Sequence, residues 1–204
     1  MAMDVAYKTT AGTPVGAIGS SAGAAYTQDL LPQHYSACKS GNMYYAAGLT
    51  NGALGGTLTA TGVTWHLSNP AGSGVDLVMV AGGVCLATST TAGHIFWVMN
   101  GTGGVSTAVV HGTPGVINNA KIGTSGVAGK AQFDTSATLP ATPIALRGIG
   151  FMQVTALAVS GQITDYVNGA IIVPPGCTLS IQTVTGIGTG MCWGCWIEQP
   201  ITAN

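Results

Sequence analysis

The stretch VTWHLSNPAGSGVDLVMVAGGVCL, residues 63–86, decides the fold class of this chain. Apolar and polar residues alternate over residues 63–67, and this period of two places the apolar side chains on one face of a strand. The cluster Asn69–Gly74 is a strong turn signal. Leu77–Val80 is continuously apolar, which predicts a strand covered on both faces. Gly82-Gly83 then predicts a bulge before the strand resumes.

Outward from this stretch, short apolar segments between turn residues predict further strands. They are Ile95–Met99, Ser106–His111, Leu146–Gln153, Thr155–Ser160, Ala170–Val173, Thr178–Val184 and Met191–Ile197. Asn100-Gly101 predicts a hairpin turn, and Pro174–Gly176 predicts a corner outside the sheet. The chain has 32 Gly and nine Pro, which leave little room for a long helix. We therefore expect an all-β fold, with a jelly-roll-like β-sandwich over residues 41–204.

Residues 1–40 have a different character. The segment Thr9–Ala25 consists mostly of small residues and shows no sustained period. Such a segment cannot build a core of its own, so we interpret residues 1–40 as an extended, low-complexity N-terminal arm that becomes ordered on neighbouring subunits. The alternative is a terminus without a role.

Charged residues make up 5% of the chain, against about 25% in an average protein. A folded monomer of this mass exposes about 8,800 Å². Five basic and six acidic residues are few for a dispersed monomer of that size. This scarcity predicts that other chains cover much of the surface. The alternative is a neutral monomer whose Thr-rich surface is heavily hydrated.

Net charge and apolar runs exclude several partners. The net charge is −1, and the basic residues are scattered as Lys8, Lys39, Lys121, Lys130 and Arg147. This distribution argues against direct nucleic-acid binding. No apolar run reaches the ~18 residues of a membrane helix, and the N-terminus lacks a secretory signal pattern, so we expect synthesis in the cytoplasm. Five cysteines are too sparse for a disulfide scaffold, which favours reduced core residues: Cys38, Cys85, Cys177, Cys192 and Cys195.

Cys192-Trp193-Gly194-Cys195 is the sharpest local motif. A C-x-x-C pair can be a redox dithiol or half of a zinc site. In a strand, however, Cys192 and Cys195 point to opposite faces, and no second pair completes a zinc site. We therefore favour packing in a core or interface and keep a redox or metal role as the alternative.

Three glycine patterns resemble catalytic or nucleotide-binding loops without matching them. Gly19–Gly23 has the spacing of a nucleophile elbow but lacks the flanking strand and helix. Gly123–Lys130 has the wrong spacing for a phosphate loop. Gly186–Gly190 lacks the third glycine of a dinucleotide-binding turn. The sequence predicts no catalytic and no cofactor-binding residue.

The histidines and tryptophans complete the candidate residues. No H-x-x-x-H pair and no acidic neighbour at ligand spacing accompany His34, His66, His94 and His111. We expect surface or half-buried histidines and no metal site. The tryptophans can fill a core or form a sugar-stacking platform, and core filling is favoured for Trp65, Trp97, Trp193 and Trp196. Trp193 and Trp196 should face opposite sides of a strand.

Over residues 43–204 the chain resembles small virion structural proteins of tailed bacteriophages. The similar segments are Leu67–Gly74 with the apolar strand after it, Ile172–Gly176, and Trp196–Pro200. The resemblance implies a capsid decoration, or cement, protein with a β-sandwich body that packs as a trimer. The scarcity of charge and the Cys- and Trp-rich last strand depart from that pattern and put the position on the particle in doubt.

Three functional hypotheses follow. In the first, the chain is a virion protein on the capsid exterior, a homotrimer that binds the major capsid protein and neighbouring copies of itself, without cofactor, nucleic acid or membrane. In the second, it is a tail-fibre or receptor-binding tip that recognises carbohydrate. In the third, which we favour least, it is a redox or hydrolytic enzyme that uses Cys192 and Cys195.

Overall fold

The computed structural model describes residues 34–48, 52–54, 58–88, 91–100, 109–123, 129–152 and 161–201, and four short strands ahead of residue 34. The chain divides into two compact units, Met1–Ser36 and Ala37–Asn204. The first unit holds two antiparallel strand pairs, β1 (Ala6–Lys8) with β2 (Pro14–Gly16) and β3 (Ile18–Gly19) with β4 (Ala25–Tyr26). The predicted arm, residues 1–40, spans this unit and the short helix α1 (Tyr35–Ser40).

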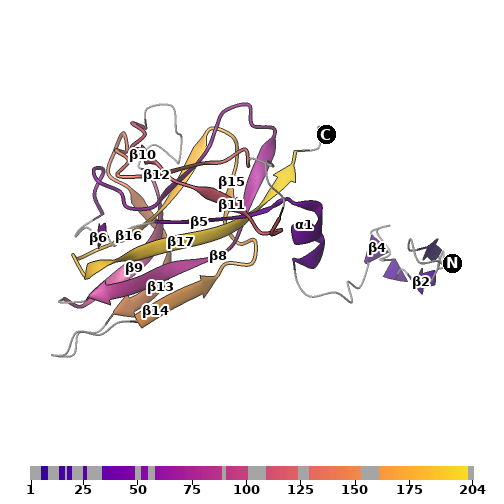
Figure 1. Cartoon of the computed structure of the whole chain (residues 1–204), viewed down its shortest axis with the longest axis horizontal. Helices are drawn as coiled ribbons and strands as arrows, with labels where there is room; N and C mark the ends of the chain where they lie inside the picture. Colours follow the sequence, from indigo (N-terminus) through magenta and orange to yellow (C-terminus); the bar gives the residue numbers. More distant parts are fainter. Residues whose placement is uncertain are drawn as a thin grey trace. The chain divides into compact units, whose positions relative to one another are not determined.

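The second unit is built from two antiparallel sheets (Figure 1). In order, the six-stranded sheet contains β10 (Thr113–Pro114), β12 (Gln132–Thr135), β7 (His66–Asn69), β16 (Cys177–Thr183), β9 (Gly93–Met99) and β13 (Ile144–Met152). The seven-stranded sheet contains β11 (Ile117–Asn119), β5 (Met43–Ala47), β17 (Gly188–Pro200), β8 (Val75–Thr88) and β14 (Gly161–Tyr166), with β15 (Ile172–Val173) paired to β8 and β6 (Gly52–Leu54) paired to β17. The all-β prediction is confirmed, while jelly-roll connectivity stays a prediction.

One core fills the space between the two sheets. Leu67 and Leu179 of the six-stranded sheet meet Leu77 and Met79 of β8 in a single apolar cluster. The same cluster contains three tryptophans with no exposed surface, namely Trp65, Trp97 and Trp196. The prediction that these three fill the core is confirmed. Large aromatic side chains bury the most apolar area, so they dominate the stability of this core.

Two glycines of the seven-stranded sheet make room for two of these tryptophans. Gly82 of β8 and Gly194 of β17 are direct register partners. A Cβ on Gly82 would overlap the indole of Trp97, and a Cβ on Gly194 would overlap the indole of Trp65. Trp65 and Trp97 meet edge to face, with ring centroids 5.9 Å apart. Because these two glycines carry no side chains, the space beside them in the seven-stranded sheet is filled by the indole rings of Trp65 and Trp97.

The prediction of a bulge at Gly82-Gly83 is wrong. β8 runs without a break from Val75 to Thr88, and its register against β17 shifts between Met79 and Ala81 and again between Leu86 and Thr88. The glycines serve close approach instead: a Cβ on Gly83 would overlap the carbonyl of Ile163 on the neighbouring strand. Sequence periodicity alone does not report such contacts across and between sheets.

The predicted turn at Asn69–Gly74 is confirmed, and Asn69 fastens it. The Asn69 side-chain amide donates to the carbonyl of Val75 at 2.7 Å and to that of Val173 at 2.8 Å. The main-chain carbonyl of Asn69 accepts from the main-chain amide of Gly176 at 2.7 Å, so the turn also meets the predicted Pro174–Gly176 corner. One buried amide therefore joins two turns that lie far apart in the sequence.

The other predicted strands have mixed outcomes. Strands are confirmed over Ile95–Met99, much of Leu146–Gln153, the end of Ala170–Val173, Thr178–Thr183 and Met191–Ile197. Thr155–Ser160 lies outside the described residues, as do Gly101 of the hairpin signal and the first half of Ser106–His111. Within that last range Val110 makes an isolated bridge to Thr138 and His111 is not in a strand.

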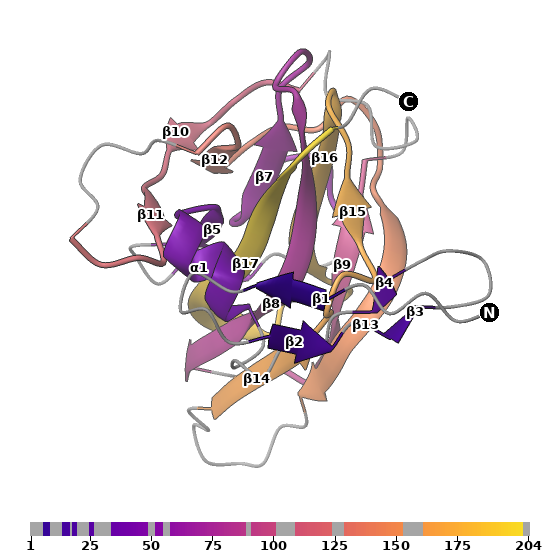
Figure 2. The same ribbon diagram turned by 90° about the vertical axis from the view of Figure 1, so that its right-hand side faces the viewer.

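Short edge strands lie on one side of the second unit, and a long edge strand lies on the other side. Figure 2 shows the short strands β10 and β11 at one side of the unit and the long strand β13 at the other. At the β13 side, Asp165 of β14 accepts from Nε1 of Trp97 at 3.0 Å and from Nη2 of Arg147 at 2.9 Å. This carboxylate joins the edges of the two sheets. Among the described residues, no helix has the length and apolar character needed to span a bilayer.

Candidate functional site

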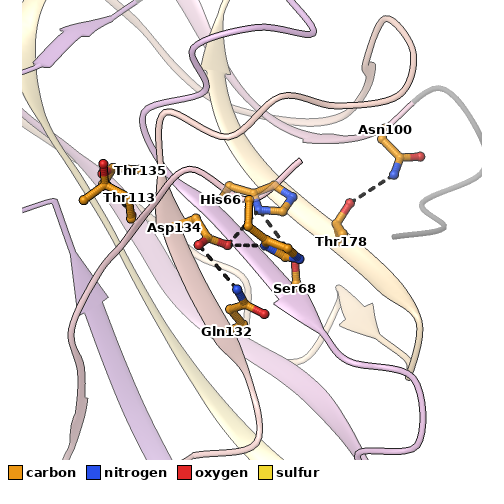
Figure 3. A network of polar contacts seen from close by, with 9 residues as sticks. His66, Ser68, Asn100, Thr113, Gln132, Asp134, Thr135 and Thr178 are labelled. Carbon is orange, nitrogen blue, oxygen red and sulfur yellow. Dashed lines mark hydrogen bonds and ion pairs between the residues drawn. The ribbon is translucent and has the colours of Figure 1, made fainter. Parts of the chain in front are cut away.

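The outward face of the six-stranded sheet carries a layer of buried polar side chains. Leu67, Phe133 and Leu179 point into the core, so their neighbours along each strand point to the opposite face. Register aligns these neighbours in two rows across β12, β7 and β16, which are Asp134–His66–Ser180 and Gln132–Ser68–Thr178. Figure 3 shows the residues of these two rows other than Ser180, together with Asn100, whose amide donates to the Thr178 hydroxyl at 3.3 Å. Buried polar groups of this density need partners, which makes the layer the first candidate site.

A His-Asp-His cluster lies at one end of the layer. Oδ2 of Asp134 lies 2.7 Å from Nδ1 of His111 and 3.8 Å from Nδ1 of His66. The side chains of Asp134 and His66 have no exposed surface, whereas that of His111 is 39% exposed. The cluster therefore has two buried members and one that reaches solvent.

Main-chain contacts bring His111 over Asp134. Val110 bridges to Thr138 on one side of His111, and Thr113 pairs with Thr135 on the other. Gly112 allows this close approach, because a Cβ there would overlap the carbonyl of Thr135. The segment is thus held on both sides of the histidine, by β12 on one side and by Thr138, which follows β12, on the other.

The electrostatics of the cluster centre on Asp134. Burial by itself raises the pKa of Asp134, but the polar contacts and positive charge of His66 and His111 outweigh burial and leave the pKa below its ordinary value. Nε2 of Gln132 lies 3.5 Å from Oδ1 of Asp134, at the limit of a hydrogen bond. Asp134 is therefore held as a carboxylate between two imidazoles.

His66 is poorly satisfied. Among the described residues, its buried Nε2 has no hydrogen-bond partner, and its Nδ1 lies 3.5 Å from the Ser68 hydroxyl. Ser68 and His66 are both buried, so this pair gives a substrate no access to a hydroxyl nucleophile. The three side chains His66, His111 and Asp134 do offer nitrogen and oxygen donors within 4.8 Å of one another, a set that can hold a metal ion.

This cluster corrects two sequence predictions. His66 was expected at the surface or half-buried, but it is fully buried; the expectation holds for His34, His94 and His111. The sequence places no acidic neighbour at ligand spacing from the histidines, but in the structure Asp134 contacts two of them. A signal existed: HLSN, QFDT and TLSIQ all alternate polar and apolar residues, so each strand carries a polar face. Pairing those strands requires knowledge of register that the sequence does not give.

The structure does not bring Cys192 and Cys195 together as a dithiol. Cys192 lies in the core between the sheets, whereas Cys195 lies in a second cluster with Met43 and Val80 on the other face. Burial raises the pKa of both thiols to about 12, although Thr64 and Tyr45 hydrogen-bond to them and act in the opposite direction. The prediction of opposite faces is confirmed, and the thiols are packed as core residues.

We expect Cys192 and Cys195 to resist alkylation in the folded protein. At pH 8 a thiol of pKa about 12 is thiolate on the order of one part in 10,000, against about a quarter for an ordinary thiol. Mass spectrometry after iodoacetamide treatment should find both residues unmodified under native conditions and modified in 6 M guanidinium. Rapid native alkylation of either residue would revive the redox hypothesis.

The tryptophans do not form the sugar platform. Trp65, Trp97 and Trp196 are fully buried, and Trp193 packs on the opposite face of β17 from Trp196. The prediction for Trp193 and Trp196 is confirmed. An aromatic binding surface would have to use other residues.

An internal carboxylate occupies the end of the Gly123–Lys130 pattern. Glu198 of β17 accepts from the amide of Lys130 at 2.7 and 2.9 Å and from the amide of Ala131 at 3.1 Å. These two amides are therefore not open to a phosphate. Gly186–Gly190 leads into β17, in line with the rejection of a dinucleotide turn, and the interior of Gly19–Gly23 lies outside the described residues.

Compared with protein-family models, curated proteins and solved structures, the chain shows no match.

Proposed function

We propose that this chain is a structural protein of a bacteriophage virion, a capsid decoration protein with a jelly-roll-like β-sandwich body. It binds the major capsid protein and neighbouring copies of itself on the capsid exterior as a homotrimer, without catalysis. The charge content of 5% and the turn segments Leu67–Gly74 and Ile172–Gly176 support the proposal. The observation that carries it furthest is the open edge of the six-stranded sheet.

Strand β13 is long and uncovered along its first half. Its five residues Ile144–Gly148 are all exposed, although side chains of a strand alternate between two faces. Among the described strands β13 pairs only with β9, so the main-chain groups on its other side are available to another chain. Soluble proteins usually blunt such edges with charge or short strands, as β10 and β11 do here by their length. The two register shifts of β13 against β9 shape this edge without covering it.

Exposed apolar side chains lie along and beside the open edge of β13. Ile144 and Leu146 of β13 are 47% and 46% exposed, and Tyr166 at the end of β14 is 69% exposed. Arg147, the charged residue of β13, is paired with Asp165 of β14, so the charge there is balanced. We call Ile144, Leu146, Phe151 and Tyr166 the β13 surface. A second chain that adds a strand here gains main-chain hydrogen bonds and buries these side chains.

A lysine on the β13 surface tests the proposal. Wild-type protein should sediment as a trimer, and Leu146→Lys should shift it toward smaller species, because a charge on an apolar interface is costly to bury. The matched control is Ile122→Lys. Ile122 is 98% exposed and follows β11, an edge strand of the seven-stranded sheet, whereas β13 is an edge strand of the six-stranded sheet. Analytical ultracentrifugation over a range of concentrations gives the mass. A wild-type protein that stays a single copy at high concentration would contradict the proposal.

One observation favours a second candidate, a carbohydrate-binding tail-fibre tip. Phe151 is 51% exposed, and its ring lies 4.6 Å from that of His94. This pair offers a small exposed aromatic surface in place of the buried tryptophans. Binding on a glycan array that Phe151→Ala abolishes would favour this candidate over capsid decoration.

A further inference from the structure

We propose that His66, His111 and Asp134 bind one divalent transition-metal ion, with zinc as the best fit. The donor atoms are two imidazole nitrogens and one carboxylate oxygen, the ligand types that zinc takes. They come from β7, β12 and the segment ahead of β10, and they lie within 4.8 Å of one another. The site is separate from the β13 surface and does not depend on the proposed function.

The spacing suits a small ion. Zinc binds nitrogen and oxygen at about 2.0–2.2 Å, which places tetrahedral ligand atoms about 3.3 Å apart. The two distances from Oδ2 of Asp134, 2.7 Å to His111 and 3.8 Å to His66, lie on either side of that value. Movements of about half an ångström would bring each of these two distances to the zinc value, and the two histidine nitrogens lie within 4.8 Å of each other. The half-exposed His111 is the one best able to move, because solvent covers part of its ring.

The weak polar contacts of His66 at Nδ1 favour a ligand there. If Nδ1 carries the proton, the Ser68 hydroxyl at 3.5 Å is at the limit of a hydrogen bond and Asp134 at 3.8 Å is beyond it. If Nε2 carries the proton, that N–H is buried without a partner among the described residues, and the Nδ1 lone pair faces both the Ser68 hydroxyl and a carboxylate. A cation between Nδ1 and Asp134 would replace the repulsion between this lone pair and the carboxylate with two attractive contacts, and it requires the tautomer with the proton on Nε2.

Neighbouring groups support the same arrangement. Gln132 lies against Oδ1 of Asp134, which leaves Oδ2 directed at the two histidines. Outer partners of this kind orient metal-ligating carboxylates. The exposure of His111 gives the ion a path from solvent and leaves room for a water as fourth ligand, as in open zinc sites. The bound ion would fasten the segment around His111 to the buried polar layer.

Zinc titration of the full chain tests the site. Protein freed of metal with EDTA and dialysed at pH 7.5 should bind one Zn²⁺ per chain by isothermal titration calorimetry. Co²⁺ should give the visible absorption of a tetrahedral site with nitrogen and oxygen ligands. Zn²⁺ should also raise the thermal unfolding midpoint, because a ligand that binds only the folded state stabilises it.

Single-residue variants assign the site. His111→Gln and Asp134→Asn should each weaken Zn²⁺ binding by more than tenfold and remove the thermal shift. His94→Gln is the matched control, because His94 is an exposed histidine outside the cluster. All variants keep the five cysteines, so thiol binding would be common to them. Absence of 1:1 binding in the wild type, or equal affinity in His111→Gln and the wild type, would overturn the proposal.

Discussion

Replacing Gly194 with valine should remove about 3 kcal/mol or more of folding free energy, the upper range for an overpacked core. A Cβ at this position would overlap Cζ2 of Trp65 and lie 2.9 Å from its Cη2. Trp65 cannot retreat, because Trp97 and Phe133 lie against it with centroid distances of 5.9 and 5.8 Å. Thermal unfolding followed by circular dichroism should show a midpoint about 6–12 °C lower.

The control for this change is the same substitution at Gly161. This glycine lies in β14 of the same sheet, and an added Cβ would have nothing within 4 Å. Gly161→Val should leave stability unchanged or raise it slightly, since valine is favoured in strands. Equal losses in the two variants would mean that glycine flexibility, and not the space beside Trp65, sets the cost.

The second large effect is expected at Glu198. Glu198→Ala leaves the part-buried amide of Lys130 and the buried amide of Ala131 without their carboxylate acceptor. Hydrogen bonds to a charged group contribute about 1.5–3 kcal/mol each, so the loss should be about 3 kcal/mol or more in urea-induced unfolding. Glu198→Gln keeps one oxygen acceptor and should lose about half as much.

Asp76 provides the comparison for Glu198. It lies on β8 opposite Gln199, one strand away from Glu198, and its removal leaves the Lys130 and Ala131 contacts in place. Asp76→Ala should therefore cost much less than Glu198→Ala. A similar cost for both would show that general loss of acidic charge, and not the two amides, explains the result.

The fold class follows from local patterns that the sequence displays. The turn at Asn69–Gly74 and the corner at Pro174–Gly176 each act over a few residues, so their structures were predictable, whereas the strand expected over residues 63–67 begins only at His66. The role of Gly82 was not predictable, because the contact that requires it comes from Trp97 on the other sheet. Sequence periodicity indicates on which face of a strand a side chain lies, but not which residues of the facing sheet it contacts.

The candidate metal site shows the same limit more strongly. His66, His111 and Asp134 are separated by long stretches of chain, and no spacing rule joins them. They meet because β12 pairs with β7 in one register and because Gly112 lets the neighbouring segment approach. A shift of one residue in that register would turn Asp134 to the opposite face of the sheet. Strand pairing, which one sequence does not reveal, therefore decides whether the site exists.

The place of β17 has a consequence for synthesis. This strand lies between β5 and β8 in the seven-stranded sheet, although β5 precedes it by about 145 residues. At about 5–20 residues per second, a ribosome takes roughly 7–30 s to travel from one to the other. Once β8 has also been made, the nascent chain holds β5 and β8 with no strand between them, so chaperone capture should be concentrated between the emergence of residue 88 and that of residue 200.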